Sequence, residues 1–313
     1  MPLPSVSKKR KICSTLLTFW IPIKSYRRAL RGILQLGVRK YFRIKKSDRT
    51  TKFENEIAIG AIMKDEGPYL KEWLDFHILA GVKKFYLYDN ESTDNTTKIL
   101  KPYIERGIVE YTYFPGHLVQ TQAYVDIINR HYNDTRWLAL IDLDEFLVPV
   151  KNKNLVDFVH TMPKHASCIV ASWVLYGSAG HKTKPKGLVM ENYKYRRKQP
   201  SGCKSIVNPR LQISQRNPHI NFVAGFVVDG SGRKLGRIDQ TGNPPPIDYI
   251  RCNHYVTKSF AEFKARCARG GPGSGPNSSR WRKKFQNYQL YNSDNIYDDI
   301  MDKWIERVKK FKL

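Results

Sequence analysis

Asp142, Asp144 and Glu145 lie within an apolar run at residues 136–150, and their types and spacing suit chemistry better than any other stretch. A short apolar run bounded by polar residues is typical of a buried strand, in which carboxylates are rare. On an extended chain, the side chains of Asp142 and Asp144 point to the same side, about 7 Å apart. Like charges at that spacing favour a cation, and Mn²⁺ or Mg²⁺ fills its remaining positions with water and substrate phosphates. The pattern therefore predicts a site for a metal and a diphosphate, although an ordinary strand end that runs into an acidic turn has the same sequence.

The elements around this run alternate between strands and helices. Compact apolar runs predict strands, and apolar residues at helical spacing predict helices. The predicted strands span residues 57–63, 82–88, 109–114, 137–148 and 167–176, and the predicted helices span residues 69–80, 92–104 and 119–131. The second helix has Ser92 as its expected N-cap. This alternation predicts an α/β fold with a doubly wound, mainly parallel sheet and helices on both faces.

Polar residues follow several of these strands. Lys64 and Glu66 follow the first strand, Asp89 and Asn90 follow the second, and residues 142–145 end the fourth. Ligands of such sheets bind at the carboxyl ends of the strands, so we expect the three clusters to meet at one edge. There, Asp89 and Asn90 are expected to hydrogen-bond a base or a ribose.

The chain has 313 residues and a net charge of +26, of which residues 1–50 contribute a large share. A chain this basic favours anionic partners such as nucleic acid, an anionic membrane or an acidic substrate. Residues 14–23 are too few to span a bilayer and lack the flanks of a cleaved signal. Five scattered cysteines without Cys-x-x-Cys spacing argue against disulfides or zinc and fit a reducing cytosol.

Residues 1–50 are predicted to associate with a membrane. Apolar and basic residues take opposite faces of one expected helix. The apolar face carries Tyr26, Leu30, Ile33, Leu34 and Tyr41, and the basic face carries Lys24, Arg27, Arg28 and Arg31. With Phe19 and Trp20 beside it, this pattern is typical of a basic amphipathic helix that lies in a membrane interface. A solvated basic extension, or a helix packed on its own catalytic domain, remains the alternative.

The chain resembles glycosyltransferase family 92 in a series of short motifs. These are Lys64-Asp65-Glu66, Leu70-Lys71-Glu72-Trp73, Asp89-Asn90-Glu91-Ser92, Trp137, Ile141-Asp142-Leu143-Asp144-Glu145, Trp173, Tyr176-Gly177-Ser178, Gly180-His181, Lys204-Ser205-Ile206-Val207, His254-Tyr255, Lys258-Ser259, Glu262-Phe263 and Arg269-Gly270. The resemblance covers roughly residues 56–270 and implies the GT-A fold, which binds nucleotide sugars and is shared with bacterial family 2-like transferases. Eukaryotic members resemble single-pass Golgi proteins, and residues 1–50 lack such a span, so we expect a bacterial enzyme that is peripheral on the cytoplasmic face of the cell membrane.

The resemblance also implies roles for individual residues. Asp142 and Asp144 would hold Mn²⁺ or Mg²⁺ against the diphosphate of a nucleotide sugar, with Asp142 also near the ribose, and His254 would be a further ligand. Lys204 would assist the leaving diphosphate electrostatically, as Arg210 or Lys258 also could.

The acceptor side is less constrained by the sequence. An inverting transferase needs a general base, for which Glu262 and His219 are the candidates and Asp229 and Asp239 the alternatives. Trp173 and His181 are predicted acceptor contacts, because an aromatic face suits the C–H surface of a sugar.

These inferences predict three regions: a membrane-associating segment at 1–50, a GT-A catalytic domain at 51–270, and a flexible Gly/Pro loop with a C-terminal helix at 271–313. The predicted activity is metal-dependent, inverting transfer of a hexose, for instance galactose from UDP-galactose, to a glycan or a lipid-linked saccharide such as lipopolysaccharide core or capsule. Two rival hypotheses stay open: a basic protein that binds nucleic acid or an anionic surface without catalysis, and a metal-dependent nucleotidyltransferase. No recognised nucleic-acid motif is present, so nucleic acid is not the expected partner.

Overall fold

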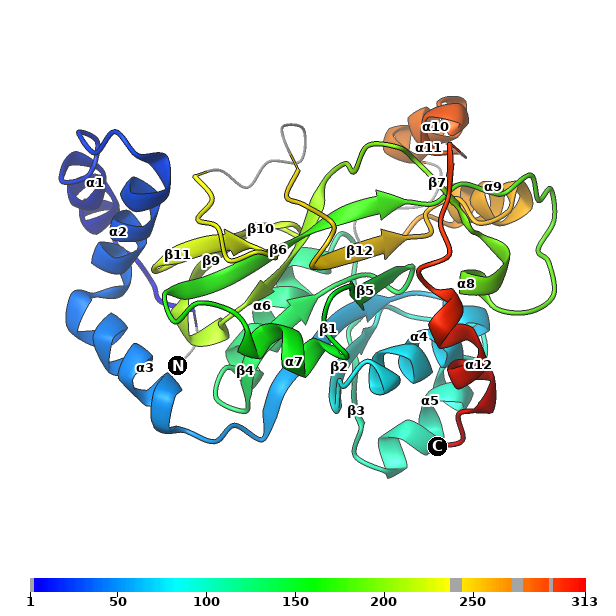
Figure 1. Ribbon diagram of the computed structural model, residues 1–313, viewed down its shortest axis with the longest axis horizontal. Helices are drawn as coiled ribbons and strands as arrows, with labels where there is room; N and C mark the ends of the chain where they lie inside the picture. Colours follow the sequence, from blue (N-terminus) through cyan, green and yellow to red (C-terminus); the bar gives the residue numbers. More distant parts are fainter. Residues whose placement is uncertain (1–2, 237–243, 272–277, 293–294) are drawn as a thin grey trace.

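The computed structural model describes residues 3–236, 244–271, 278–292 and 295–313. At its centre is a nine-stranded sheet with strand order β3-β2-β1-β4-β8-β6-β12-β5, in which β11 also pairs with β6 (Figure 1). Most of the strand pairs are parallel, and helices cover both faces of the sheet. The predicted α/β class with a mainly parallel sheet is therefore confirmed.

The amino-terminal half of the sheet is parallel and follows the predicted alternation. It consists of β1 (Asn55–Met63), α4 (Gly67–Leu79), β2 (Lys84–Asp89), α5 (Thr96–Glu105), β3 (Val109–Tyr113), α6 (Gln120–His131) and β4 (Thr135–Leu140). Successive β1 residues face opposite sides, so Ile59 packs with Trp73 of α4 and Ile62 packs in the cluster that includes Ile127 of α6. The prediction that Ser92 caps α5 was wrong, because that helix begins after Asn95.

The second half of the sheet is mixed. It contains β5 (Glu145–Pro149), β6 (Ala166–Leu175), β8 (Cys203–Val207), β11 (Phe226–Asp229) and β12 (Ile250–His254). β8 runs antiparallel to both β4 and β6, and β12 runs antiparallel to β5. Short elements connect these strands: α7 (Leu155–His160), α8 (Val189–Asn192), β7 (Tyr195–Arg196), the 3₁₀ turn Pro209–Leu211, β9 (Gln212–Asn217) and β10 (Ile220–Val223).

The single strand predicted at residues 137–148 is two strands. β4 ends at Leu140, the chain turns through residues 141–144, and β5 starts at Glu145 and pairs with β12 instead of continuing beside β1. The apolar run gave no sign of this break because both strands are buried. Asp142 and Asp144 therefore lie in a turn and not at alternate positions of an extended strand.

Residues 1–50 form several helices and not the single helix predicted. These are α1 (Lys8–Leu16), α2 (Lys24–Leu36) and α3 (Val38–Thr50), which flank the sheet at the left of Figure 1. Tyr41, predicted on the membrane face, is buried in a cluster with Leu211 and Ala224. Among the residues described, no helix has the length and apolar character to cross a bilayer.

The carboxy-terminal elements are α9 (Phe260–Arg269), α10 (Ser279–Gln286), α11 (Tyr288–Tyr291), β13 (Ile296–Tyr297) and α12 (Asp302–Lys310). α12 packs against α4, where the Trp304 ring meets Phe76 with centroids 5.2 Å apart. Most of the Gly/Pro loop predicted as a lid or linker, residues 272–277, lies outside the described residues.

Candidate active site

A cavity of about 410 Å³ opens at the carboxyl edge of the parallel strands. Its wall includes the turn between β4 and β5, the end of β1, the turn between β9 and β10, and helices α9 and α10. The side chains that line it include Lys64, Glu66, Gln120, Asp142, Asp144, Trp173, His219, His254, Arg266, Arg269, Arg280, Trp281 and Lys284. The polar segments that follow β1 and β4 therefore meet at one edge, as the parallel topology requires.

Asp142 is held by three neighbours that converge on its carboxylate. Oδ1 accepts hydrogen bonds from Gln120 Nε2 at 3.0 Å and Tyr124 Oη at 2.9 Å. Oδ2 lies 3.1 Å from Nζ of Lys204. Burial raises the pKa of Asp142, but the lowering influences, chiefly the charge and the hydrogen bond of Lys204, together hold the pKa below its usual value. Asp142 is therefore an anion at neutral pH.

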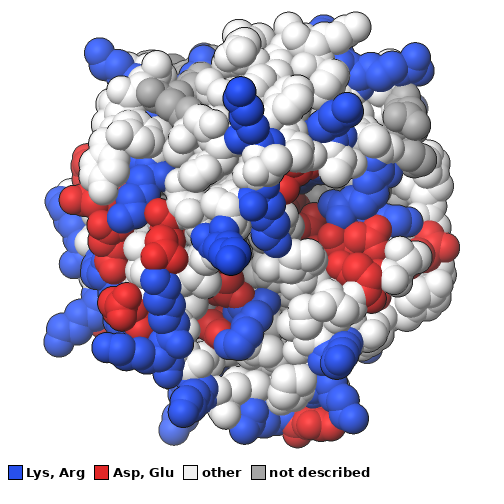
Figure 2. Space-filling view, turned by 90° about the vertical axis from the view of Figure 1, so that its right-hand side faces the viewer, with Lys and Arg blue, Asp and Glu red and all other residues white. Residues whose placement is uncertain are grey.

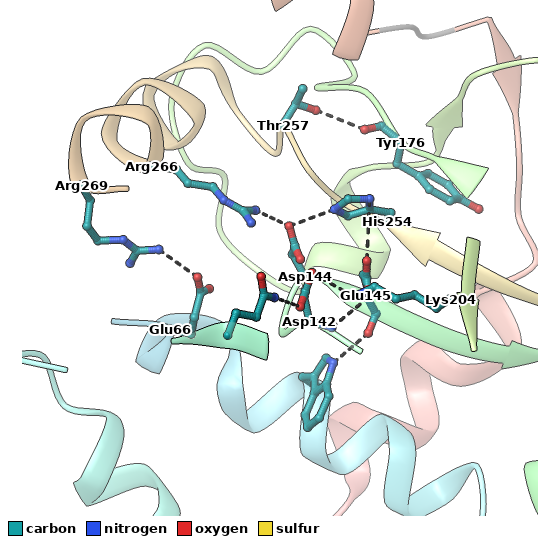
Figure 3. A network of polar contacts seen from close by, with 12 residues as sticks. Glu66, Asp142, Asp144, Glu145, Tyr176, Lys204, His254, Thr257, Arg266 and Arg269 are labelled. Carbon is teal, nitrogen blue, oxygen red and sulfur yellow. Dashed lines mark hydrogen bonds and ion pairs between the residues drawn. The ribbon is translucent and has the colours of Figure 1, made fainter. Parts of the chain in front are cut away.

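Asp144 is buried, and its carboxylate contacts two side chains that are not among the three that hold Asp142. Figure 3 shows His254 and Arg266 both pointing at its carboxylate, with His254 Nε2 3.2 Å from Oδ2. Burial raises the pKa of Asp144, yet Arg266 and His254 together hold that pKa well below its usual value. The other oxygen, Oδ1, is buried and has no hydrogen-bond partner among the residues that the structure describes.

Glu145 and Lys204 form the buried base of the site. The Lys204 side chain is 1% exposed, and its Nζ lies between Asp142 and Glu145, 3.3 Å from Glu145 Oε2. The same Glu145 oxygen accepts the backbone N–H of Asp142 at 2.8 Å, which closes the turn on itself. Burial opposes the charge of Lys204, but the two carboxylates raise its pKa well above the usual value. A permanent cation is therefore fixed beneath the aspartates.

The side chains at the cavity suit a hard divalent ion by type. Asp142, Asp144 and His254 offer carboxylate oxygens and an imidazole nitrogen, which are ligands of Mn²⁺ and Mg²⁺. The unpartnered Oδ1 of Asp144 is the kind of buried acceptor that an ion would satisfy. Within the described part of the chain, no three His, Cys, Asp or Glu side chains are already grouped as a metal site. Arg266 contacts one carboxylate oxygen of Asp144, and this contact keeps that oxygen from grouping with the other possible metal ligands.

Aromatic and imidazole rings form one side of the cavity. The Trp173 ring lies 4.8 Å from the rings of both His254 and His219. Gly202 makes room for it, since a Cβ there would sit 2.3 Å from the indole. Burial and the charge of Lys204 lower the pKa of His219 to about 3, so this imidazole is neutral at physiological pH.

Some of the predicted donor-binding residues lie away from the cavity. Asp89 accepts hydrogen bonds from the backbone of Ser92 and the hydroxyl of Tyr111, and Asn90 donates to the carbonyls of Phe114 and Gly116. Neither Asp89 nor Asn90 lines the cavity. Their contacts brace the loops that follow β2 and β3.

Some of the predicted bases and acceptor contacts also lie outside this cavity. Glu262 caps α9 through Ser259, accepts hydrogen bonds from Tyr69 and Tyr193, and lines a neighbouring cavity of about 300 Å³. His181 packs on Tyr193 and contributes to neither cavity. The remaining alternatives are no nearer: Asp229 is bound by Ser231 and Arg233, and Asp239 lies outside the described residues.

Several residues of the cavity were missed from the sequence. Gln120 and Tyr124 share one face of α6 at a spacing of four residues, which places both beside Asp142. Arg266 and Arg269 share one face of α9 at a spacing of three residues, and Arg269 donates to Glu66 at 2.9 Å. Such spacing is the available signal, but it is common on solvated helices and does not show which face meets the carboxylates.

Three cationic side chains line this cavity on the side of α9 and α10, and we call them the roof cations: Arg266, Arg280 and Lys284. Burial and repulsion from Arg266 and Arg280 lower the pKa of Lys284 to about 8. The ammonium also lies 4.6 Å from the ring of Trp281. More generally, Lys and Arg are spread over the face seen in Figure 2, whereas Asp and Glu gather in a few groups. Positive charges held this close together favour an anionic ligand.

Residues 64–222, half of the sequence, match the model of glycosyltransferase family 92. The chain belongs to glycosyltransferase family 92. Among curated relatives that carry this family name, a Ricinus communis protein is 27% identical over 216 residues, and an Arabidopsis thaliana protein is 25% identical over 236 residues. These alignments cover 68% and 71% of this chain but 37% and 39% of the two plant proteins. The family 92 chain thus spans little more than a third of the curated relatives it matches.

Solved structures resemble the family 92 chain more distantly. S. aureus TarS 1-349 has a TM-score of 0.39 at 11% identity, covering 68% of this chain and 64% of that chain. Glucosyl-3-phosphoglycerate synthase from Mycobacterium tuberculosis has a TM-score of 0.31 at 11% identity, covering 54% of this chain and 61% of that chain.

Proposed function

We propose that this family 92 chain is a metal-dependent glycosyltransferase that moves a hexose from a nucleotide diphosphate sugar to a saccharide. One observation carries the proposal: a single cavity holds Asp142, Asp144 and His254 together with the roof cations. A ligand that brings a divalent ion and a diphosphate satisfies both groups at once. Membership of the family supports sugar transfer as the reaction.

The metal is Mn²⁺ or Mg²⁺, and Asp142, Asp144 and His254 are the residues that would hold it. When bound, such an ion supplies Lewis-acid neutralisation of the charge on the leaving diphosphate. The chain's own contribution is electrostatic: Lys204 keeps Asp142 ionised from below, and the roof cations offer charge and hydrogen bonds to phosphate oxygens. Because Arg266 pairs with Asp144, it competes with any ion for that carboxylate.

His219 is the better placed of the two proposed bases. It lines the cavity, where its neutral imidazole can accept a hydrogen bond from an acceptor hydroxyl, although a pKa of about 3 makes it a weak base for the proton transfer that an inverting reaction requires. Both oxygens of Glu262 are already occupied by hydrogen bonds. Trp173 beside His219 offers an aromatic face for a sugar ring.

Donor and acceptor are proposed at the level of the class. A UDP-hexose such as UDP-galactose is the proposed donor, and a glycan or lipid-linked saccharide, for instance lipopolysaccharide core or capsule, is the proposed acceptor. The resemblance to family 92 and the anion-favouring cavity support these assignments.

The decisive experiment measures release of nucleoside diphosphate from a panel of nucleotide sugars with Mn²⁺, with Mg²⁺ and with a chelator. Slow hydrolysis counts as turnover, because it needs no acceptor. We expect one donor to be turned over only when metal is present. A parallel assay supplies a nucleoside triphosphate and a sugar 1-phosphate, and release of pyrophosphate there, without turnover of any nucleotide sugar, would assign a nucleotidyltransferase. The absence of both donor turnover and metal-dependent donor binding by calorimetry would contradict the proposal.

A further inference from the structure

The amino-terminal hairpin, defined here as α1, the turn at residues 17–23 and α2, has its polar side chains on the inside. Ser14 and Thr18 are buried between the two helices, although they are among the more polar residues of the segment. Gln35 donates to the Ser14 hydroxyl at 3.0 Å, and Arg31 donates to the Thr18 hydroxyl at 3.2 Å. Hydrogen bonds between buried polar side chains therefore join α2 to α1 and to the turn of this hairpin.

The large apolar side chains at the turn of the hairpin point outward. Leu16, Leu17, Phe19, Trp20 and Ile23 are each between 58% and 66% exposed. They cluster at the turn, and Trp20 is held there by a hydrogen bond from its indole to the carbonyl of Leu17. A water-soluble surface normally has the opposite arrangement, with polar groups outside and apolar groups within.

The hairpin does not use this apolar surface to bind its own domain. α2 docks instead through its other face: Leu36 packs in a cluster with Leu211 and Ala224, a Cβ on Gly32 would lie 2.2 Å from the carbonyl oxygen of Val223, and Ala29 is buried. Arg28 adds a hydrogen bond of 2.8 Å to the carbonyl of Asn221. The hairpin is thus fixed to β10 and the loop before β11, and its apolar turn faces away from that contact.

Positive charge surrounds the apolar turn. Residues 1–47 contain no Asp or Glu, and Lys8, Lys9, Lys11 and Lys24 are exposed on the same hairpin. A basic surface around a cluster of Trp, Phe and Leu complements a bilayer, which offers hydrocarbon within and anionic headgroups at the interface. In Figure 1 the hairpin rises on the same side of the sheet as α10, the helix that carries Arg280 and Lys284.

We propose that the hairpin anchors the protein to a bilayer that contains anionic lipid, by inserting the turn at residues 17–23 into the interface. The basic residues hold the headgroups, and the polar interior keeps the two helices together where apolar packing has no advantage. This anchor differs from the flat helix predicted from sequence, because Tyr41 is buried and the inserted side chains come from the turn.

The first test compares Trp20→Glu with the matched control Phe42→Glu. Phe42 lies on α3 outside the hairpin, is 62% exposed against 66% for Trp20, and both changes add the same charge to the same basic segment. The full chain is sedimented with phosphatidylcholine vesicles, with and without phosphatidylglycerol. We expect binding that requires phosphatidylglycerol, a loss of about tenfold or more in Trp20→Glu, and a loss below about threefold in Phe42→Glu.

A second measurement reports insertion directly. Of the six tryptophans, Trp73, Trp137, Trp281 and Trp304 are buried and Trp173 lines the cavity, so Trp20 is the one exposed to lipid. Brominated phosphatidylcholine should quench its fluorescence, and Trp20→Phe should bind vesicles but lose the quenching.

Equal losses in the two glutamate variants would mean that charge alone binds the membrane, and unchanged quenching in Trp20→Phe would mean that the turn does not insert. A second copy of the chain is the other possible occupant. A dimer seen by sedimentation equilibrium without vesicles, and dissociated by Trp20→Glu, would assign the apolar turn to self-association. Each of these results overturns the proposal.

Discussion

The carboxylates of Asp298 and Asp144 both lie in buried ion networks, and the two networks differ in what they leave unpaired. Both oxygens of Asp298 accept hydrogen bonds: Arg251 donates at 2.6 and 2.9 Å, and Arg196 and the backbone of Ile300 complete the set. Asp144 also meets an arginine, Arg266, but one of its oxygens has no partner.

The surroundings of the two arginines differ in the same way. Arg251 is 5% exposed at its side chain and donates also to Tyr176, whereas Arg266 is 23% exposed and lies in the cavity beside Arg280. The Asp298 network joins β12 to the carboxy-terminal segment, and both carboxylate oxygens of Asp298 are paired within the protein. The Asp144 network has an unused acceptor and surplus cations, which is the arrangement expected of a binding site.

The largest expected effect of this difference is on catalysis. Asp144→Asn should lower metal-dependent donor turnover by about 100-fold or more, because a neutral amide is a poor ligand for a hard ion. The same change should also lower the free energy of unfolding, because Arg266 and His254 hold the pKa of the buried Asp144 well below its usual value. Donor turnover and urea unfolding of the same preparation measure both quantities. Full turnover with normal metal dependence in a folded variant would remove Asp144 from the site.

Asp298→Asn should lower the free energy of unfolding and leave donor turnover almost unchanged. Burial opposes ionisation, but Arg251 and Arg196 lower the pKa of Asp298 to about 2, so the ionised form stabilises the fold by about 2 kcal/mol at neutral pH. A lowered pKa gives stability that is present above the unfolded-state value near 3.8 and is lost as the pH falls towards 2. The stability difference between wild type and variant, measured by urea unfolding, should therefore shrink from pH 5 to pH 3. Donor turnover at pH 7 should stay within about twofold.

Asp299→Asn is the matched control for both carboxylates. Asp299 is the exposed neighbour of Asp298, so its replacement should change the free energy of unfolding by no more than about 0.5 kcal/mol and leave turnover intact. If Asp299→Asn matched Asp298→Asn in stability, the contribution assigned to the Arg251 pair would be wrong.

The smallest effect concerns a roof cation. Lys284→Gln should weaken donor binding by about tenfold, the value of one charge-assisted hydrogen bond to phosphate, without lowering stability. Stability should even rise slightly, because repulsion from Arg266 and Arg280 disappears. Lys283→Gln, at the exposed neighbouring position of α10, is the control. Calorimetry with UDP and Mn²⁺ measures both variants, and equal affinities for the two would show that Lys284 does not face the phosphates.

The sequence predicted the parallel half of the sheet because local rules decide it. β1 and β2 are each a compact apolar run followed by a polar cluster, and amphipathic helices separate β1, β2 and β3. The same rule located Asp142 and Asp144 at the sheet edge. The rule gave a wrong prediction at residues 141–144, where two buried strands follow each other closely. The two aspartates of this turn are equally compatible with a single strand that ends in carboxylates.

The rest of the site depends on long-range pairing, which periodicity does not encode. Lys204 reaches Asp142 because β8 is inserted between β4 and β6, and His254 reaches Asp144 because β12 pairs with β5. Asp89 has the same type and position relative to its strand as a ligand-binding residue, yet Tyr111 from β3 occupies its carboxylate. The single helix predicted within residues 1–50 was wrong for a different reason: helical periodicity does not show that the chain breaks at Gly37 between α2 and α3, or that Tyr41 packs against Leu211 and Ala224 of the same protein.

The contact between Asp144 and its partners also determines when the site can form during folding. Asp144 lies 110 residues before His254 and 122 residues before Arg266. Contacts so distant in sequence carry a large loop-closure cost and tend to form late, whereas β1, β2, β3 and β4 pair with near neighbours. A nascent chain that ends before β12 therefore holds a nearly complete parallel half but carries its aspartates without these partners. The protein should gain its metal affinity only late in folding, after synthesis of β12, which supplies His254.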